Sequence, residues 1–305
     1  MHTKQKSKQN YIKKMRIAIF SANYRAENDK LLKKTIDFLE KNGIDVLVES
    51  GLHTQMERTD SRFKDCKTVD ADNLQADIAI SIGGDGTFLN TAAAVGNRGI
   101  PILGINNGRL GFLADVADTE IEQVLAEVIA GNYKIRERCI IQANTSDNSG
   151  RGLPFALNEI AVLKQDLSSL IAIHASVNGE YLNTYQADGL IIATPTGSTA
   201  YSLSVGGPIV MPGTHNLILA PVASHSLTVR PLVIADTCEI DLEIESRSHN
   251  YLISLDGRSQ PMSQNTKLHI TKADFTIKII EPNGHSFFRT LKNKLMWGMD
   301  KRIEK

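Results

Sequence analysis

The chain has 305 residues, more than the usual length of one domain, so two domains with separate hydrophobic cores are expected. Its 34 lysines and arginines equal its 34 aspartates and glutamates, which removes any overall electrostatic argument for binding nucleic acid or an anionic membrane. These properties favour a small molecule as the partner.

Residues 1–14 are expected to form a disordered basic arm. The arm is rich in lysine, and no acidic residue precedes Glu27. Met15 stands directly before the first strand-like run, so the arm is predicted to be dispensable for folding and activity. No signal-peptide apolar region follows the arm, and no 18 apolar residues run together, which favours a soluble cytoplasmic protein.

Residues 15–133 alternate strand and helix patterns, which predicts an α/β domain with a Rossmann-like parallel sheet. The small-residue stretch after the glycine loop at residues 83–87 is predicted to be helical, and Gly43 suits the end of the first helix. Strands are expected over residues 16–21, 44–49, 76–82 and 100–106, and helices over 27–42, 88–96 and 118–130.

Residues 134–280 show the period-two pattern of antiparallel strands, as in Glu239–Glu245, and are predicted to form a mostly antiparallel β domain. Asn178-Gly179 predicts a hairpin between residues 171–177 and 180–185, because both residues tolerate positive φ. The tail, residues 281–305, is expected to pack back on the first domain. Further strands are expected over residues 156–164, 189–194, 216–222, 251–255, 267–270 and 275–280.

The loop Gly83-Gly84-Asp85-Gly86-Thr87 is the strongest chemical signal. Glycines let backbone amides approach phosphate oxygens, while the Asp85 carboxylate could accept a proton or position Mg²⁺. The loop is neither a Walker P-loop nor a dinucleotide fingerprint, since neither spacing occurs. A tight turn with an ordinary turn aspartate is the structural alternative.

The segment Thr194–Pro208 is rich in hydroxyl residues and glycine and follows an apolar strand. Hydroxyls suit phosphate and ribose, and Tyr201 offers a ring for stacking; a flexible linker is the alternative. Asn158, Glu159 and Asp188 lie beside predicted strands and could bind ribose hydroxyls or an adenine amino group, or could be turn residues. Asn106-Asn107-Gly108 and Asp256-Gly257 carry weaker signals of the same kind.

Other site types are disfavoured. No histidine has metal-ligand spacing, no nucleophile elbow is present, and Cys66, Cys139 and Cys238 lie far apart without C-x-x-C spacing. The cysteines are expected to be reduced thiols.

The combined motifs resemble those of the NAD kinase family. They occur in the family's order over residues 15–297 and comprise G-G-D-G-T at 83–87, N-N-G-R-L-G-F-L at 106–113, N-E at 158–159, A-D-G-L at 187–190, T-P-T-G-S-T-A-Y-S-L-S-V-G-G-P at 194–208, H-S-L-T-V-R-P at 225–231 and D-G at 256–257. The resemblance implies phosphorylation of the adenosine ribose 2′-hydroxyl of NAD, with ATP, another triphosphate or polyphosphate as donor and a divalent metal, expected to be Mg²⁺. It also implies an α/β domain joined to a β-sandwich-like C-terminal domain, and assembly into a homodimer or homotetramer.

By resemblance, Asp85 is the expected general base, and Gly83, Gly84, Gly86 and Thr87 shape the phosphate end. The expected dinucleotide contacts are Asn158, Glu159, Asp188, Thr199, Ala200, Tyr201, Ser202, Leu203 and Ser204, and Arg258 takes the place of a contact that relatives often make with Gln. No metal ligand is assigned.

Asn90, Ser169 and Gln186 depart from the family pattern, which often has basic residues or histidine there. Two rival functions are a lipid or sphingoid kinase, which shares the glycine loop, and a non-catalytic dinucleotide sensor. The Thr194–Pro208 motif argues against the first, and Asp85 argues against the second.

Overall fold

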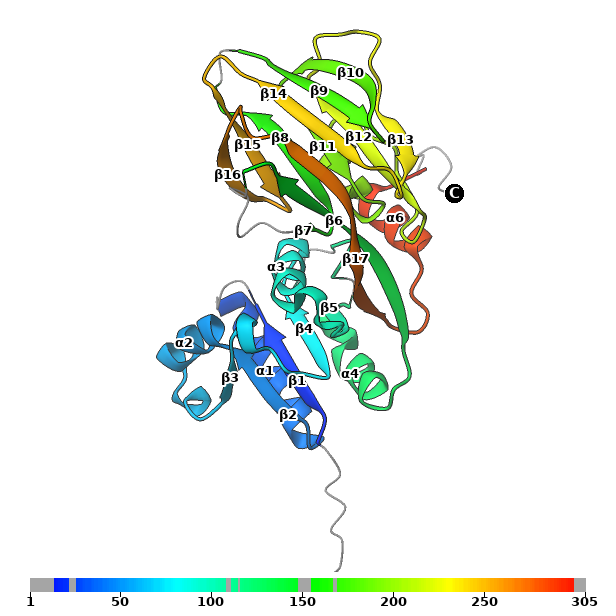
Figure 1. Ribbon diagram of the computed structural model, residues 1–305. Coiled ribbons are helices and arrows are strands. Elements are labelled where there is room, and N and C mark those ends of the chain that lie inside the picture. The colour runs from blue at the N-terminus through cyan, green and yellow to red at the C-terminus, as the bar shows by residue number, and fades with distance from the viewer. Residues whose placement is uncertain are drawn as a thin grey trace, which may run out of the picture.

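The computed structural model describes residues 14–21, 26–107, 111–114, 116–147, 155–166 and 169–298 (Figure 1). Residues 1–13 of the predicted arm lie outside the described residues, as do Gly108, Arg109 and Leu110 of the N-N-G-R-L-G-F-L motif. Within the described ranges, no helix is long and apolar enough to cross a membrane.

The first half is the predicted parallel sheet with helices on its faces. The strands run parallel in the order β5-β4-β1-β2-β3. The strands are β1 (Arg16–Phe20), β2 (Asp45–Glu49), β3 (Lys67–Val69), β4 (Ile78–Ile82) and β5 (Ile102–Ile105), and the helices are α1 (Ala26–Lys41), α2 (Ser50–Thr59), α3 (Asp85–Val95) and α4 (Ile121–Ile129). Sequence patterns missed α2 and β3, because α2 buries only Leu52 and Met56 in an otherwise polar stretch.

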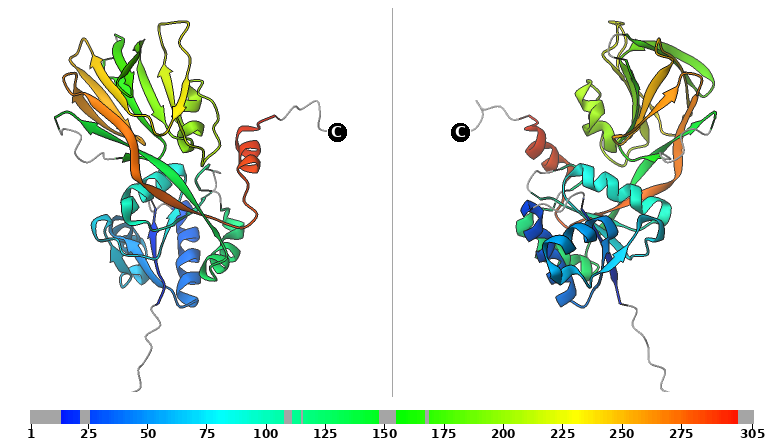
Figure 2. Two further views of the ribbon diagram at one scale, coloured as in Figure 1. Left: turned by 45° about the vertical axis from the view of Figure 1, so that its right-hand side comes forward. Right: turned by 90° about the vertical axis from the view of Figure 1, so that its left-hand side faces the viewer.

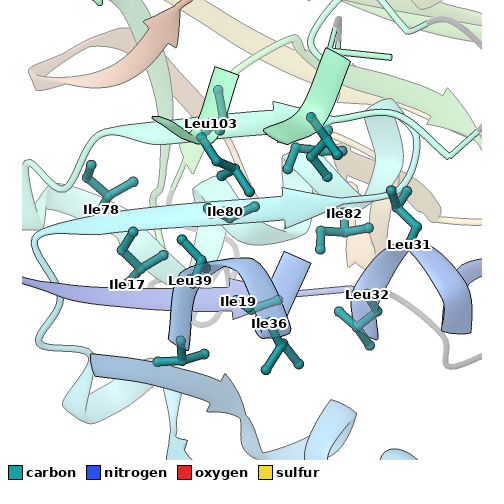
Figure 3. Packing of buried hydrophobic residues seen from close by; sticks show 14 of the residues in the cluster. Ile17, Ile19, Leu31, Leu32, Ile36, Leu39, Ile78, Ile80, Ile82 and Leu103 are labelled. Carbon is teal, nitrogen blue, oxygen red and sulfur yellow. The ribbon is translucent and has the colours of Figure 1, made fainter. Parts of the chain in front are cut away.

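The core of this half lies between the sheet and the helices that cover one of its faces. Alternate residues of β4, such as Ile78 and Ile80, point to the same face as Ile17 and Ile19 of β1 (Figure 3). Leu32, Ile36 and Leu39 of α1 pack against them at helical spacing. This packing fixes the carboxyl end of β4, from which the glycine loop emerges.

The second half packs two antiparallel layers around its own core, as predicted. One layer is a six-stranded sheet in the order β13-β12-β11-β8-β15-β16. Asn178 and Gly179 have φ of 52° and 78°, which confirms the hairpin. The strands are β6 (Lys134–Thr145), β7 (Phe155–Ala156), β8 (Glu159–Lys164), β9 (Ile171–Val177), β10 (Glu180–Ala187), β11 (Gly189–Ala193), β12 (Asn216–Val222), β13 (Leu232–Ala235), β14 (Ile240–Glu245), β15 (Asn250–Leu255), β16 (Arg258–Ser263) and β17 (Leu268–Glu281), with a short helix α5 (Tyr201–Ser204).

One strand, β17, belongs to both halves. Two separate strands were predicted over residues 267–270 and 275–280, but the structure has one strand of 14 residues with an irregularity between Lys272 and Thr276. β17 pairs with β14 in the second half, and its Ile279 aligns in parallel with Ile102 of β5 (Figure 1). The larger sheet therefore has 11 strands and crosses the predicted boundary, so the division at residues 133 and 134 stays a prediction.

After β17 the chain turns back and forms α6 (Phe287–Leu295), which lies at the side of the molecule (Figure 2). Asn283 Nδ2 donates to the carbonyl of Asn132 at 3.0 Å, and Lys294 Nζ lies 4.3 Å from the centre of the Phe112 ring. Both contacts join the segment after β17 to residues before β6.

Candidate active site

The glycine loop connects β4 to α3 in a conformation that requires glycine. Gly83 has φ of 154°, and a Cβ there would collide with the Thr87 side chain. The predicted helix start at Phe88 was wrong: α3 begins at Asp85, with Gly84 as its N-cap. Sequence propensity missed this first turn because glycine is a poor helix former, although glycine is acceptable at the N-cap.

The Asp85 carboxylate is held by a row of backbone amides. The N–H groups of Phe112, Leu113 and Ala114 donate to its two oxygens at 2.7, 2.9 and 3.2 Å. A Cβ on Gly111 would collide with the same carboxylate, so a side chain there would displace it. Asp85 therefore joins the G-G-D-G-T loop to the second motif, through its contacts with residues 111–114.

Asp256 repeats this arrangement in the second half. Its side chain is 3% exposed, and it accepts the N–H groups of Leu157, Asn158 and Glu159 at 2.7, 2.8 and 3.2 Å. Asp256 has φ of 51°, a conformation that aspartate tolerates better than most residues. In the sequence, Asp256-Gly257 carried a weak ligand-site signal and matched a family motif, whereas the structure gives Asp256 a hydrogen-bonding role across distant segments.

The hydroxyl-rich segment packs directly on Asn158. Thr194 Oγ1 donates to the carbonyl of Leu157 at 2.6 Å, and the Thr194 N–H donates to the carbonyl of Asn158 at 2.8 Å. A Cβ on Gly197 would collide with the Asn158 carbonyl. The segment is therefore not a linker, and it brings residues Thr199–Ser204 beside Asn158 and Glu159.

Three buried polar atoms of this cluster have no hydrogen-bond partner among the described residues. They are Asn158 Oδ1, Glu159 Oε2 and Ser202 Oγ, on side chains that the sequence predicted to bind a dinucleotide. An unsatisfied buried polar group costs about 1–3 kcal/mol, so native proteins rarely keep several together. The hydrogen bond from the Tyr201 N–H to Glu159 brings the two segments that carry these atoms side by side, and a polar ligand could complete the missing bonds.

Glu159 is the most strongly perturbed acid of the cluster. Burial, reinforced by the negative charge of Asp256, raises its pKa from 4.5 to about 7, and a hydrogen bond from the Tyr201 N–H opposes the rise. A carboxyl group poised near neutrality in a cleft is a frequent mark of a functional site.

Of two further predicted contacts, Asp188 lies elsewhere in a single chain, and Arg258 lies beside Asp256, with a guanidinium nitrogen 3.8 Å from its carboxylate. Asp188 forms an ion pair with Lys164 at 2.6 Å, at the end of β8 and β11 that is opposite to Glu159. With five residues of strand between these ends, the separation is roughly 15 Å. Arg258 donates to the carbonyls of Phe155 and Leu255 at 2.7 and 3.1 Å, so it supports the turn beside Asp256.

The three positions that depart from the family pattern lie outside this cluster of unsatisfied atoms. Asn90 is exposed on α3 and lines a separate pocket of about 230 Å³ with Ser21 and Glu49. Gln186 is exposed on β10, and Ser169 lies just before β9.

A protein-built metal centre has no support in the ranges that the structure describes, because no group of three His, Cys, Asp or Glu side chains lies close enough to hold an ion. A divalent ion at this site would need most of its oxygen ligands from a bound substrate, which is how Mg²⁺ is commonly held in phosphoryl-transfer enzymes.

Comparisons with known proteins identify the family of the chain. The ATP-NAD kinase N-terminal domain matches residues 17–133, and the ATP-NAD kinase C-terminal domain matches residues 157–282. An NAD kinase from Bacteroides fragilis is 50% identical over 291 residues, covering 95% of this chain and all of that protein. An NAD kinase from Cytophaga hutchinsonii is 41% identical over 291 residues, covering 94% of this chain and all of that protein.

Two solved structures share the fold. Yeast NADH kinase in complex with NADH superposes with a TM-score of 0.86 at 23% identity, covering 96% of this chain and 90% of that one. An NAD kinase from Archaeoglobus fulgidus in complex with ATP gives a TM-score of 0.73 at 25% identity, covering 92% of this chain and 99% of that one.

Proposed function

The chain belongs to the NAD kinase family, and on that premise we propose how its residues transfer the phosphoryl group. The activity is that of an NAD kinase: ATP phosphorylates the 2′-hydroxyl of the adenosine ribose of NAD, and the products are NADP and ADP. The observation that carries the residue assignment is the group of unsatisfied atoms on Asn158, Glu159 and Ser202.

The acceptor dinucleotide binds along this group. Its hydroxyl and amino groups donate to the free oxygens of Asn158 and Glu159, and Thr199, Ala200 and Tyr201 form the adjoining wall. Leu203 is partly buried, and the exposed Ser204 donates a hydrogen bond from its hydroxyl to the Tyr201 carbonyl. These two residues therefore shape the short helix α5 rather than line the buried side of that helix. Asp188 lies apart from the unsatisfied atoms, as described above, whereas Arg258 lies 3.8 Å from the Asp256 carboxylate that holds the backbone of Asn158 and Glu159.

Asp85 acts on the reacting hydroxyl. The 2′-oxygen forms a bond to the γ-phosphorus while the bond from that phosphorus to the β,γ-bridging oxygen breaks, and the proton of the 2′-hydroxyl passes to the Asp85 carboxylate. Three donated hydrogen bonds hold this carboxylate in place, and a loose transition state in which proton removal comes late needs a well-positioned acceptor more than a strong base. The flanking glycines leave room for phosphate oxygens.

A magnesium ion bound to the triphosphate would neutralise charge on the transferring group. Of the glycine-loop residues, Asp85 would hold this ion through its carboxylate oxygens. We further propose a homodimer or homotetramer, supported by the exposed apolar edge strand β13, where Leu232 and Val233 are 37% and 44% exposed. The free cysteines fit a reducing compartment such as the cytoplasm.

The test is NADP formation from NAD, ATP and Mg²⁺ by wild type and by Asp85→Asn. We expect a loss of about 10²-fold or more in kcat for the variant, the usual range for removal of a general base. The Asn amide would also face the N–H of Phe112, so residues 111–114 should loosen and NAD binding should weaken modestly. An unchanged kcat in a folded variant would remove Asp85 from the chemistry.

The same assay separates the rival functions. A lipid kinase would phosphorylate a sphingoid base or diacylglycerol and leave NAD unchanged. A sensor would bind NAD in calorimetry without producing NADP.

A further inference from the structure

The C-terminal helix α6 reaches the loop that holds the Asp85 carboxylate. Lys294, in the last turn of α6, places its ammonium nitrogen 4.3 Å from the centre of the Phe112 ring, and this nitrogen is buried. A cation over an aromatic face is attracted by the ring, most strongly where water is excluded. The contact therefore joins the last helix of the chain to the residue whose N–H donates to Asp85.

Phe112 is the least anchored of the three residues that donate to Asp85. Leu113 and Ala114 are buried, and they pack so closely on β5 that a Cβ on Gly104 would collide with the Leu113 carbonyl. Phe112 is only partly buried, and it lines a cavity of about 580 Å³ that α6 also lines. The core thus fixes Leu113 and Ala114, whereas the Phe112 ring has the ammonium group of α6 against it.

The Phe112 N–H decides how the carboxylate is oriented. It donates to Oδ2 of Asp85 at 2.7 Å, while the N–H groups of Leu113 and Ala114 both donate to Oδ1 at 2.9 and 3.2 Å. Among the described residues, no other group donates to Oδ2. If Phe112 moves, the carboxylate can rotate about its Cβ–Cγ bond and lose the alignment that proton transfer needs.

The position of Lys294 on α6 favours this contact over a general role at the helix end. Phe287, Leu291 and Lys294 follow at helical spacing and share one face of α6, and Leu291 is buried. A lysine in the last turn also stabilises a helix through its dipole, but Lys292 can do this equally. Residues two apart on a helix differ by about 200° of rotation, so the exposed Lys292 faces away from Phe112.

We propose that Lys294 is a positioning residue for phosphoryl transfer and that it acts on the Asp85 carboxylate through Phe112. This inference rests on the proposed role of Asp85 and adds the C-terminal helix to the parts of the chain that the reaction needs. Lys294 holds the Phe112 ring, and the Phe112 N–H holds Oδ2. The carboxylate thereby stays aligned with the 2′-hydroxyl of the acceptor.

The first test is Lys294→Met, which keeps the aliphatic stem and removes the charge. We expect kcat for NADP formation to fall roughly 5- to 20-fold, the range for losing one desolvated cation–π contact, while KM for ATP and KM for NAD each change less than about 2-fold. Lys294→Arg keeps a cation that binds aromatic faces, so its kcat should stay within about 2-fold of wild type. Lys292→Met removes the same charge from the opposite side of α6 and should leave kcat unchanged.

Combining Lys294→Met with Asp85→Asn shows whether the lysine acts through the carboxylate. In the Asp85→Asn background, Lys294→Met should lower the residual rate less than about 2-fold, because the group that it aligns is already lost. An equal loss in both backgrounds overturns the proposal, as does an unchanged kcat in Lys294→Met. A rise in KM for ATP at constant kcat also overturns it, since Lys294 would then bind the donor.

Hydrogen exchange tests the contact without turnover. In the protein without substrates, we expect the amide protons of residues 111–114 to exchange about 3-fold faster or more in Lys294→Met, and at the wild-type rate in Lys292→Met. If Lys294→Met does not fold, Phe112→Leu, which removes the ring instead, provides the same measurement. Unchanged exchange overturns the proposal even if kcat falls. Failure of wild type to form NADP would instead refute the proposed function, and hydrogen exchange would still decide the contact.

Discussion

Replacing Asp256 by Asn removes one hydrogen-bond acceptor from a carboxylate whose two oxygens both accept backbone N–H groups. One oxygen of Asp256 accepts the N–H groups of Asn158 and Glu159, and the other accepts the N–H of Leu157. If the Asn oxygen keeps the first pair, its amide group faces the Leu157 N–H, donor against donor. The backbone that presents Asn158 and Glu159 to the ligand would then shift.

The magnitude follows from the bonds lost. Hydrogen bonds to a charged group contribute about 1.5–3 kcal/mol each, and neutral bonds contribute about 1 kcal/mol. One bond disappears, two become neutral, and the Leu157 N–H is left unsatisfied, while the cost of burying the Asp256 charge is removed. A net loss of about 2–4 kcal/mol in the free energy of unfolding is expected.

The assay is urea unfolding followed by circular dichroism, with KM for NAD measured in parallel. Asp274→Asn, at an exposed position on β17, is the matched control and should stay within about 0.5 kcal/mol of wild type. KM for NAD should rise in Asp256→Asn and not in the control. A destabilisation below 0.5 kcal/mol, with KM unchanged, would refute the reasoning.

Two further predictions concern the same cluster. Since the pKa of Glu159 is about 7 in the fold against an ordinary 4.5, the folded state binds this proton more tightly, and stability is lost as pH rises from 4.5 to about 7. Glu159→Gln should therefore gain stability relative to wild type over this range, by on the order of 3 kcal/mol in pH-dependent unfolding; a constant difference would contradict the assignment. Gly197→Ala would place a methyl group against the Asn158 carbonyl, so we expect the free energy of unfolding to fall by about 1–3 kcal/mol and KM for NAD to rise. Unchanged stability and KM would mean that residues 194–208 can shift to make room for the methyl group.

Local signals accounted for much of the fold. The Asn178-Gly179 hairpin and the parallel strands followed from turn chemistry and strand patterns, because both depend on residues that are neighbours in the sequence. β17 was read as two strands because Ala273 and Asp274 interrupt its alternation, and its pairing with β5 depends on a partner far away in the chain.

The candidate site was predictable where residue type decides the chemistry. Asp85, Asn158 and Ser202 have side chains that suit the proposed reaction, and the motifs identified them. The roles of Asp256 and Gly111 depend on contacts between segments that only folding brings together, so turn chemistry alone could not find them. Asp188 was grouped with Glu159 by residue type, yet it lies at the other end of the same strands.

The strand shared by both halves has a consequence for biosynthesis. During translation, the strands of the parallel sheet leave the ribosome long before β17 is made. The outer edge of β5 therefore has no partner from β17 while most of the second half is still being synthesised. An unpaired sheet edge invites association with other chains, and nascent forms truncated before Leu268 should be the species most dependent on chaperones.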